Sequence, residues 1–165
     1  MKGRKRHLLV DSTGLVLKVL VHPADVTDRV GGQQLLEAIP ALAERFPRLH
    51  QLWVDSAYQG SFVDWVEQTL GWTVQVIRRP RRWMWVRADQ EPPVVPAGFQ
   101  VLPRRWVVER PHGWLGRWRR LSKDYEYLPA TSECVVYASM IRVMLRRLAE
   151  SMASCLLRSP LEAVR

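Results

Sequence analysis

The segment from Leu49 to Ile77 constrains the fold most, because it contains a strand, a helix and a second strand in close succession. An apolar run ends at Asp55, and a helical pattern with apolar residues on one face follows over residues 61–71. Gly71 is a typical C-terminal cap for this helix. A helix that connects two strands is characteristic of α/β proteins, so the segment predicts a layered α/β domain.

A hairpin is predicted before this unit. Apolar runs over residues 7–10 and 15–21 flank the turn sequence DSTG, in which Gly14 marks the turn. A helical pattern from Leu35 to Phe46 follows, bent or divided at Pro40. A hairpin followed by a strand–helix–strand unit predicts a mixed sheet flanked by helices.

The C-terminal part is predicted to be helical, from near Arg105 to past Leu121 and again from near residue 131. The final helix is expected to bury one apolar face, formed by Val136, Tyr137, Met140, Ile141, Met144, Leu145 and Leu148. Residues 79–104 are rich in proline and predict a long loop or small insertion. We expect one domain over residues 1–150 and a tail over residues 151–165.

The charge balance predicts a polyanionic partner. The chain has 25 Lys and Arg against 16 Asp and Glu, a net charge of +9, and clustered cations of this kind bind nucleic acid by displacing counterions. The basic clusters at residues 2–6, 78–82 and 104–123 are far apart in sequence, and a folded protein can bring them onto one surface. An RNA-binding protein would share this charge but would not explain the carboxylates described next.

No apolar run approaches the length of a membrane span or a secretory signal, so a cytoplasmic protein without a membrane partner is expected. With a nucleic-acid partner it would be nucleoid-associated. Cys134 and Cys155 lie in helical sequence without a metal-binding pattern, which favours buried thiols. Four tryptophans are expected in the core, namely Trp53, Trp65, Trp114 and Trp118.

Glu109 is the only acid in a strongly basic helical stretch. On a helical wheel, Arg105, His112 and two glycines lie within about 60° of it. The glycines remove side chains beside the carboxylate and would let a bulky ligand approach. Pro111 is tolerated where the helix begins shortly before it, which places Glu109 in the first turn.

Asp55 is the second candidate acid, at the carboxyl end of a predicted strand, where ligands of α/β sheets bind. The alternative is that Asp55 caps the helix after it. Together, Asp55 and Glu109 suggest oxygen ligands for a divalent metal beside a phosphate backbone.

Four motifs in this order, GRKRHLLVDSTGLVL, HPADVTDR, WVDSAYQG and RRWVVERPHGWLGRWRRLSKDYE, resemble the C-terminal part of DDE transposases of the bacterial insertion-sequence four/five type. The resemblance extends to about Ala149. It implies DNA transposition and recombination by an RNase H-like domain. In that domain two Asp and one Glu hold two Mg²⁺ or Mn²⁺ ions for cleavage and strand transfer. Asp55 matches the second Asp, and Glu109 matches the Glu.

The basic residues around these motifs are expected to contact the DNA of the terminal repeats and the target. They are Arg78, Arg79, Arg81, Arg82, Arg105, Arg110, Arg117, Arg119, Arg120 and Lys123. Trp83 and Trp85 either pack in the loop or stack on bases and wedge into DNA.

The first Asp of the family lies on a strand upstream of GRKRH, the motif at which this chain begins. Asp11 is rejected as a substitute, because in the implied fold it ends a strand antiparallel to the first and lies at the sheet edge opposite Asp55. We therefore expect an RNase H-like sheet that lacks its central first strand, inactive alone, in a homo-oligomer or assembled with an N-terminal transposase part. The alternative is a non-catalytic DNA-binding regulator or decayed fragment that competes with a full-length transposase.

Overall fold

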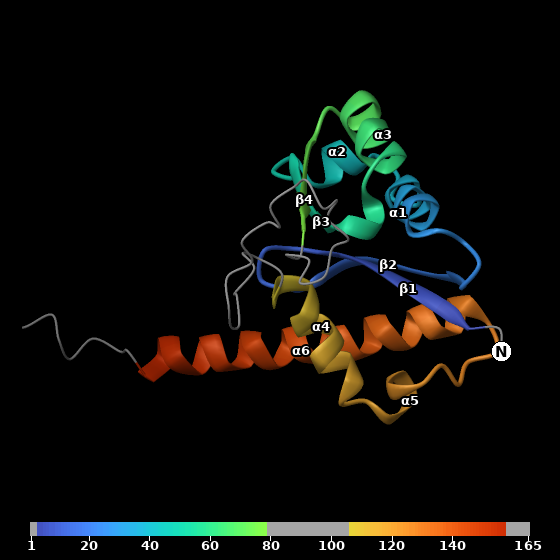
Figure 1. Ribbon diagram of the computed structural model, residues 1–165. Coiled ribbons are helices and arrows are strands. Elements are labelled where there is room, and N and C mark those ends of the chain that lie inside the picture. Colours follow the sequence, from blue (N-terminus) through green and yellow to red (C-terminus); the bar gives the residue numbers. More distant parts are fainter. Residues whose placement is uncertain (1–2, 79–105, 158–165) are drawn as a thin grey trace, which may run out of the picture. The chain divides into compact units, whose positions relative to one another are not determined.

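The computed structural model describes residues 3–78 and 106–157, which form a mixed α/β structure of small sheets and helices (Figure 1). The chain divides into two compact units, one of residues 1–24 with 109–165 and one of residues 25–108. The predicted loop at 79–104 lies outside the described residues, as do Arg79, Arg81, Arg82, Trp83, Trp85 and Arg105. The domain boundary at residue 150 stays a prediction.

The first unit begins with the predicted hairpin. Strand β1 (Arg4–Val10) pairs antiparallel with β2 (Val16–Pro23). In the turn, Asp11 Oδ1 accepts hydrogen bonds from the backbone N–H groups of Thr13 (2.8 Å) and Leu15 (2.9 Å). Gly14 has a φ of 84°, in the left-handed region that glycine adopts without strain. The hairpin prediction is confirmed, with each strand about two to three residues longer than expected at its outer end.

Helix α6 (Pro129–Leu157) packs along β2. Two backbone N–H groups of β2 donate to its side chains, Val19 N to Tyr137 Oη (3.1 Å) and Val21 N to Glu133 Oε1 (2.8 Å). A strand edge normally exposes such groups to pairing with other strands. The side chains of α6 therefore close the outer edge of β2.

Two shorter helices contribute to the core of the first unit, α5 (Arg119–Ser122) and, from Glu109 on, α4 (Trp106–Gly116). The sequence predicts one continuous helix here, and this is wrong, since helix α4 ends at Gly116. In a continuous helix Leu115 and Leu121 would lie about 120° apart, yet both are buried in the same cluster. The break lets both side chains reach one core, whose members are Val16, Val19, Val21, Leu115, Leu121, Val136 and Met140.

Helix α6 has two apolar faces rather than the single one predicted. Val136 and Met140 are buried, whereas Ile141, Leu145 and Leu148 are 55%, 60% and 60% exposed. Leu145 lies about 180° from Val136 around the helix, so one neighbour cannot cover both. Cys134, expected to be buried, is also exposed.

The second unit contains the predicted strand–helix–strand segment. Strand β3 (Gln51–Asp55), the short 3₁₀ helix η1 (Ser56–Tyr58), helix α3 (Ser61–Leu70) and strand β4 (Thr73–Ile77) follow one another. The two strands are parallel, and Gly71 caps α3 with a φ of 66°, as predicted. In the described part of the chain the strands form two small sheets, the antiparallel pair β1–β2 and the parallel pair β3–β4, flanked by helices.

The sequence predicts a helix that is either bent or divided at Pro40, and the structure shows that it is divided. Helix α1 (Asp28–Glu37) ends before it and α2 (Leu42–Arg45) begins after it. Helix α1 approaches its neighbours closely at Gly32, where an added Cβ would lie 2.8 Å from Tyr58 Cε1 and 2.9 Å from Phe62 Cε2. Only a glycine allows this approach without a shift of the two rings. The packing holds η1, and so the segment after Asp55, against α1.

Tryptophans are less buried than the sequence suggested. All four indoles expected in the core are half-buried, namely those of Trp53, Trp65, Trp114 and Trp118. Within the described ranges the fully buried indole is that of Trp72. Part of the indole surface therefore stays available for contacts with other side chains.

Candidate active site

Asp55 is the last residue of β3 and pairs in register with Ile77, the last residue of β4. Because the two strands are parallel, their carboxyl ends meet at the same edge of the sheet, where ligands of α/β sheets bind. Arg78 follows Ile77 directly, and both Asp55 and Arg78 are exposed. The predicted metal ligand Asp55 and the predicted DNA contact Arg78 thus lie at the same edge of the sheet.

The carboxylate of Asp55 also caps a helix. Its Oδ1 accepts a hydrogen bond of 2.8 Å from Ala57 N at the start of η1, while α3 begins after Gly60 without a side-chain cap. The capping alternative is therefore correct for η1 and not for α3. A carboxylate has about four acceptor sites, so one cap bond leaves capacity for a cation.

Tyr58 is a residue of this edge that sequence reasoning missed. Burial raises its pKa well above the usual range, and the negative charges of Asp28 and Asp55 raise it further. The phenol therefore stays protonated at neutral pH. It lies three residues after Asp55 in the same motif, DSAYQG, but it is neither an acid nor a cation, the residue types from which the sequence predicts the site.

Glu109 lies in the first turn of α4 and is exposed, as predicted. Among the described residues, no atom would lie within 4 Å of a Cβ added at Gly113 or Gly116, so these two positions of the helix are not packed against other described residues. Pro111 and Leu115 are buried on the other side. Pro111 is the sixth residue of α4 and thus deeper in the helix than expected, where it removes one intrahelical hydrogen bond.

His112 follows Glu109 by about one turn. Partial burial lowers the pKa of its imidazole, and the positive charge of Arg6 lowers it further. The imidazole is therefore neutral at neutral pH and adds no charge to the surface beside Glu109.

Arginines of α6 stack on the indoles of this region. The guanidinium of Arg147 lies 4.5 Å from the ring centroid of Trp114, and that of Arg142 lies 5.5 Å from the ring of Trp118. Arg110 lies 5.9 Å from the Trp114 ring on α4 itself. Such cation–π contacts orient the cations. Arg142 and Arg147 are absent from the predicted set, because nothing in their local sequence points to α4.

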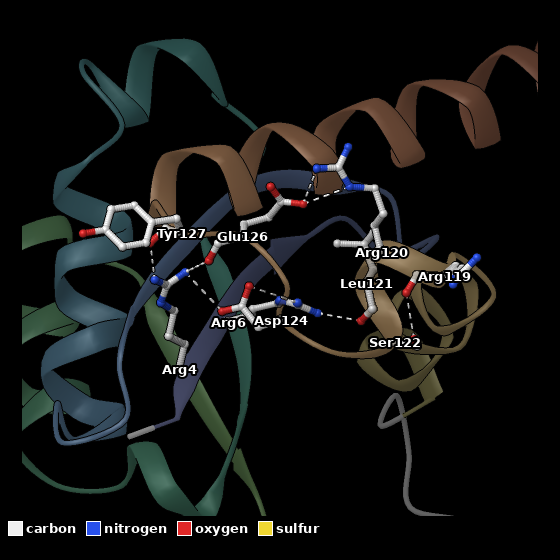
Figure 2. A network of polar contacts seen from close by, with 9 residues as sticks. All are labelled: Arg4, Arg6, Arg119, Arg120, Leu121, Ser122, Asp124, Glu126 and Tyr127. Atoms are coloured by element: carbon white, nitrogen blue, oxygen red, sulfur yellow. Dashed lines mark hydrogen bonds and ion pairs between the residues drawn. The ribbon is translucent and has the colours of Figure 1, made fainter. Parts of the chain in front are cut away.

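A network of ion pairs and hydrogen bonds fixes the segment between α5 and α6 against β1 (Figure 2). Arg4 Nη1 lies 3.3 Å from Asp124 Oδ2, and Arg4 also donates to the carbonyls of Glu126 and Tyr127. Arg6 Nη1 donates to the carbonyl of Leu121 at 2.9 Å. The sequence placed Arg4 and Arg6 in a cluster for polyanions, whereas the structure engages both in contacts within the unit.

Arg120 belongs to the same network. Its Nη2 lies 2.6 Å from Glu126 Oε1, and the Glu126 side chain is only 8% exposed. The predicted DNA contact of Arg120 would therefore compete with an ion pair that anchors Glu126. Four other predicted contacts of this unit are exposed, namely Arg110, Arg117, Arg119 and Lys123.

The two candidate ligands belong to different units, Asp55 to the second and Glu109 to the first. Within residues 3–78 and 106–157, no group of three or more His, Cys, Asp and Glu side chains is arranged to hold a metal ion. Both exposed carboxylates nonetheless offer the oxygen donors that Mg²⁺ and Mn²⁺ prefer. In the same part of the chain, no helix is both long and apolar enough to cross a membrane.

Comparison with known families gives one result. The family model described as "Transposase DDE domain" matches residues 1–144, a segment that includes both Asp55 and Glu109. No curated protein and no solved structure matches the chain.

Proposed function

Because the chain belongs to the transposase DDE domain family, we propose that it acts in DNA transposition by metal-dependent phosphodiester cleavage and strand transfer. The DNA would be the ends of an insertion sequence of the four/five type. The observation that carries the proposal is the family match over residues 1–144, which spans both exposed carboxylates. The positive charge of +9 supports a DNA partner.

Asp55 and Glu109 are the proposed metal ligands. Their geometry supports this role, since one ends a strand of a parallel pair and the other lies in the first turn of a helix, and both are exposed. Two bound Mg²⁺ or Mn²⁺ ions would activate the attacking hydroxyl and stabilise the leaving oxygen. The exposed cations Arg78, Arg117 and Arg119 would hold the phosphate backbone nearby.

We further propose that the RNase H-like sheet is completed by a strand from an N-terminal transposase part, which also brings the third carboxylate. The two separate strand pairs are consistent with a missing strand. Tyr137 and Glu133 already occupy the outer edge of β2, so an added strand would pair with β1 instead. Asp11 Oδ1 accepts three hydrogen bonds, two from Thr13 and one from Leu15, which supports a structural role for Asp11.

The test is cleavage of terminal-repeat DNA in Mg²⁺ or Mn²⁺ by residues 1–165, alone and with an added segment that carries an Asp-Ser strand. We expect products only when both parts are present. Cleavage by the 165-residue chain alone would contradict the claim of incompleteness. DNA binding without cleavage in either case would favour the non-catalytic regulator instead.

Substitution of exposed arginines should affect DNA binding, whereas substitution of arginines in the ion-pair network should affect stability. Replacing Arg117 and Arg119 by Gln is expected to weaken DNA binding and to reduce the slope of log affinity against log salt by about 0.9 per lost phosphate contact. Arg4→Gln is expected to lower the melting temperature with no change in slope, because Arg4 stabilises Asp124 and the backbone before α6. Fluorescence anisotropy over a salt series measures the slope. An unchanged slope in the double variant would mean that neither arginine contacts phosphate.

A further inference from the structure

The ring of Tyr58 is held by two helices of the second unit. Its centroid lies 5.4 Å from that of the Phe62 ring on α3. The ring also meets α1 at Gly32, where an added Cβ would lie 2.8 Å from Cε1 and 2.9 Å from Cδ1 of Tyr58. A side chain at position 32 would therefore force the ring to shift. The glycine thus fixes the place of the phenol, and with it the place of the hydroxyl group.

Helix α1 and η1 each bring one carboxylate toward this phenol. Asp28 lies four residues before Gly32, which is about one turn earlier on the same face of α1. Asp55 lies three residues before Tyr58, and its Oδ1 accepts from Ala57 N in the same short turn. Burial raises the pKa of the Tyr58 hydroxyl most, and the negative charges of Asp28 and Asp55 raise it further. Both carboxylates therefore act on one hydroxyl group.

A protonated phenol suits a position beside two carboxylates. It is neutral, so it adds no negative charge, and it can donate one hydrogen bond. Hydrogen bonds to ionised acceptors are about twice as strong as those between neutral groups. Tyr58 is therefore a donor at neutral pH, in surroundings where its neighbouring acceptors carry charge.

The cap bond alone holds the Asp55 side chain weakly. It engages one of the two carboxylate oxygens at an exposed position, where water competes for the same oxygen. Asp28 carries a like charge in the same surroundings, and a modest repulsion is then enough to turn Asp55 away from its cap. A neutral donor beside both carboxylates offsets this repulsion.

We propose that Tyr58 is a positioning residue for Asp55, whose hydroxyl group keeps the carboxylate in its capping orientation against the repulsion from Asp28. With Oδ1 engaged by Ala57 N, this orientation leaves Oδ2 for a cation. That the orientation serves metal binding rests on the function proposed above, whereas the orientation itself does not. Groups that orient a metal ligand in this way typically change metal affinity by about 10- to 100-fold.

The first test measures the orientation of Asp55 without metal or DNA. Three-bond couplings between Hα and Hβ of Asp55, measured by nuclear magnetic resonance on the 165-residue chain at neutral pH, report its χ1 rotamer. We expect one rotamer in the unmodified chain. Tyr58→Phe keeps the ring and loses the hydroxyl group, so several rotamers should be averaged. Tyr58→Phe with Asp28→Asn should return toward one rotamer, because the repulsion is then removed as well.

Tyr137→Phe is the matched control. It removes a tyrosine hydroxyl group that accepts from Val19 N at 3.1 Å, but it does so in the first unit. Asp55 should keep one rotamer in this variant, even though a hydrogen bond is lost. Circular dichroism checks that each variant is folded.

The second test asks whether the orientation serves metal binding. The probe is Mn²⁺, whose free concentration is followed by electron paramagnetic resonance in the presence of the chain together with the added Asp-Ser segment. We expect binding to weaken about 10- to 100-fold in Tyr58→Phe and to be unchanged in Tyr137→Phe. Binding that Asp55→Asn does not weaken would contradict the proposed metal site, while the couplings would still decide the role of Tyr58.

Three outcomes of the coupling measurement would overturn the proposal. Several Asp55 rotamers in the unmodified chain would do so whether or not any variant folds. One rotamer retained in Tyr58→Phe would show that the hydroxyl group does not hold the carboxylate. Averaging that persists in the double variant would show that Asp28 does not supply the repulsion.

Discussion

Glu109→Gln and Asp55→Asn should each lower metal-dependent cleavage of terminal-repeat DNA by at least ~100-fold, while DNA affinity changes only a few-fold. The amides keep the size of the carboxylates but lose the negative charge that holds a divalent cation. Metal-ion stabilisation of the transition state amounts to several kcal/mol, and each ~1.4 kcal/mol corresponds to a tenfold change in rate. The assay uses the unmodified cleavage-competent assembly as its reference.

Matched controls lie on α3 of the second unit. Asp64→Asn and Glu67→Gln remove exposed carboxylates in the same way, and neither residue lies at the strand edge or on α4. Cleavage should remain within about twofold of the reference for both controls. Retained cleavage by Glu109→Gln would mean that Glu109 is not a metal ligand. If a control variant still bound DNA but lost cleavage, the loss of cleavage in the Asp55 and Glu109 variants would not be specific to the proposed metal ligands.

Met140→Ala should lower the free energy of unfolding by about 2–5 kcal/mol, because it leaves a cavity in the core of the first unit. Met140 is 1% exposed in a cluster with Val19 and Val136. Leu145→Ala, five residues later on the same helix and 60% exposed, should change that free energy by no more than about 0.5 kcal/mol.

Chemical denaturation at low protein concentration measures both variants, so that self-association does not contribute to the comparison. Equal losses in the two variants would mean that the faces of α6 are wrongly assigned. A loss larger for Leu145→Ala than for Met140→Ala would reverse the assignment.

Local signals made much of the fold predictable. Gly14, Pro40 and Gly71 each impose a backbone conformation that ends or divides an element, so the hairpin and the strand–helix–strand unit follow from short stretches of sequence. The position of Asp55 was predictable from the end of an apolar run, and that of Glu109 from the start of a helical pattern.

Contacts between distant segments were not predictable. Arg4 and Asp124 are 120 residues apart, and nothing near either residue indicates the other. Helix α6 is apolar on two faces, so periodicity alone could not decide which face the hairpin covers. The effect of Asp28 on the Tyr58 hydroxyl depends in the same way on packing, in this case on the close approach of α1 at Gly32.

The closure of the β2 edge by α6 has a consequence during protein synthesis. Val21 is made 112 residues before Glu133, to which its backbone N–H group donates. At ~5–20 residues per second, that interval is roughly 6–22 s. The second unit is one continuous segment, whereas the first unit combines residues from both ends of the chain. Until α6 is made, the backbone N–H groups of Val19 and Val21 lack these acceptors, and the outer edge of β2 is open to pairing with other strands.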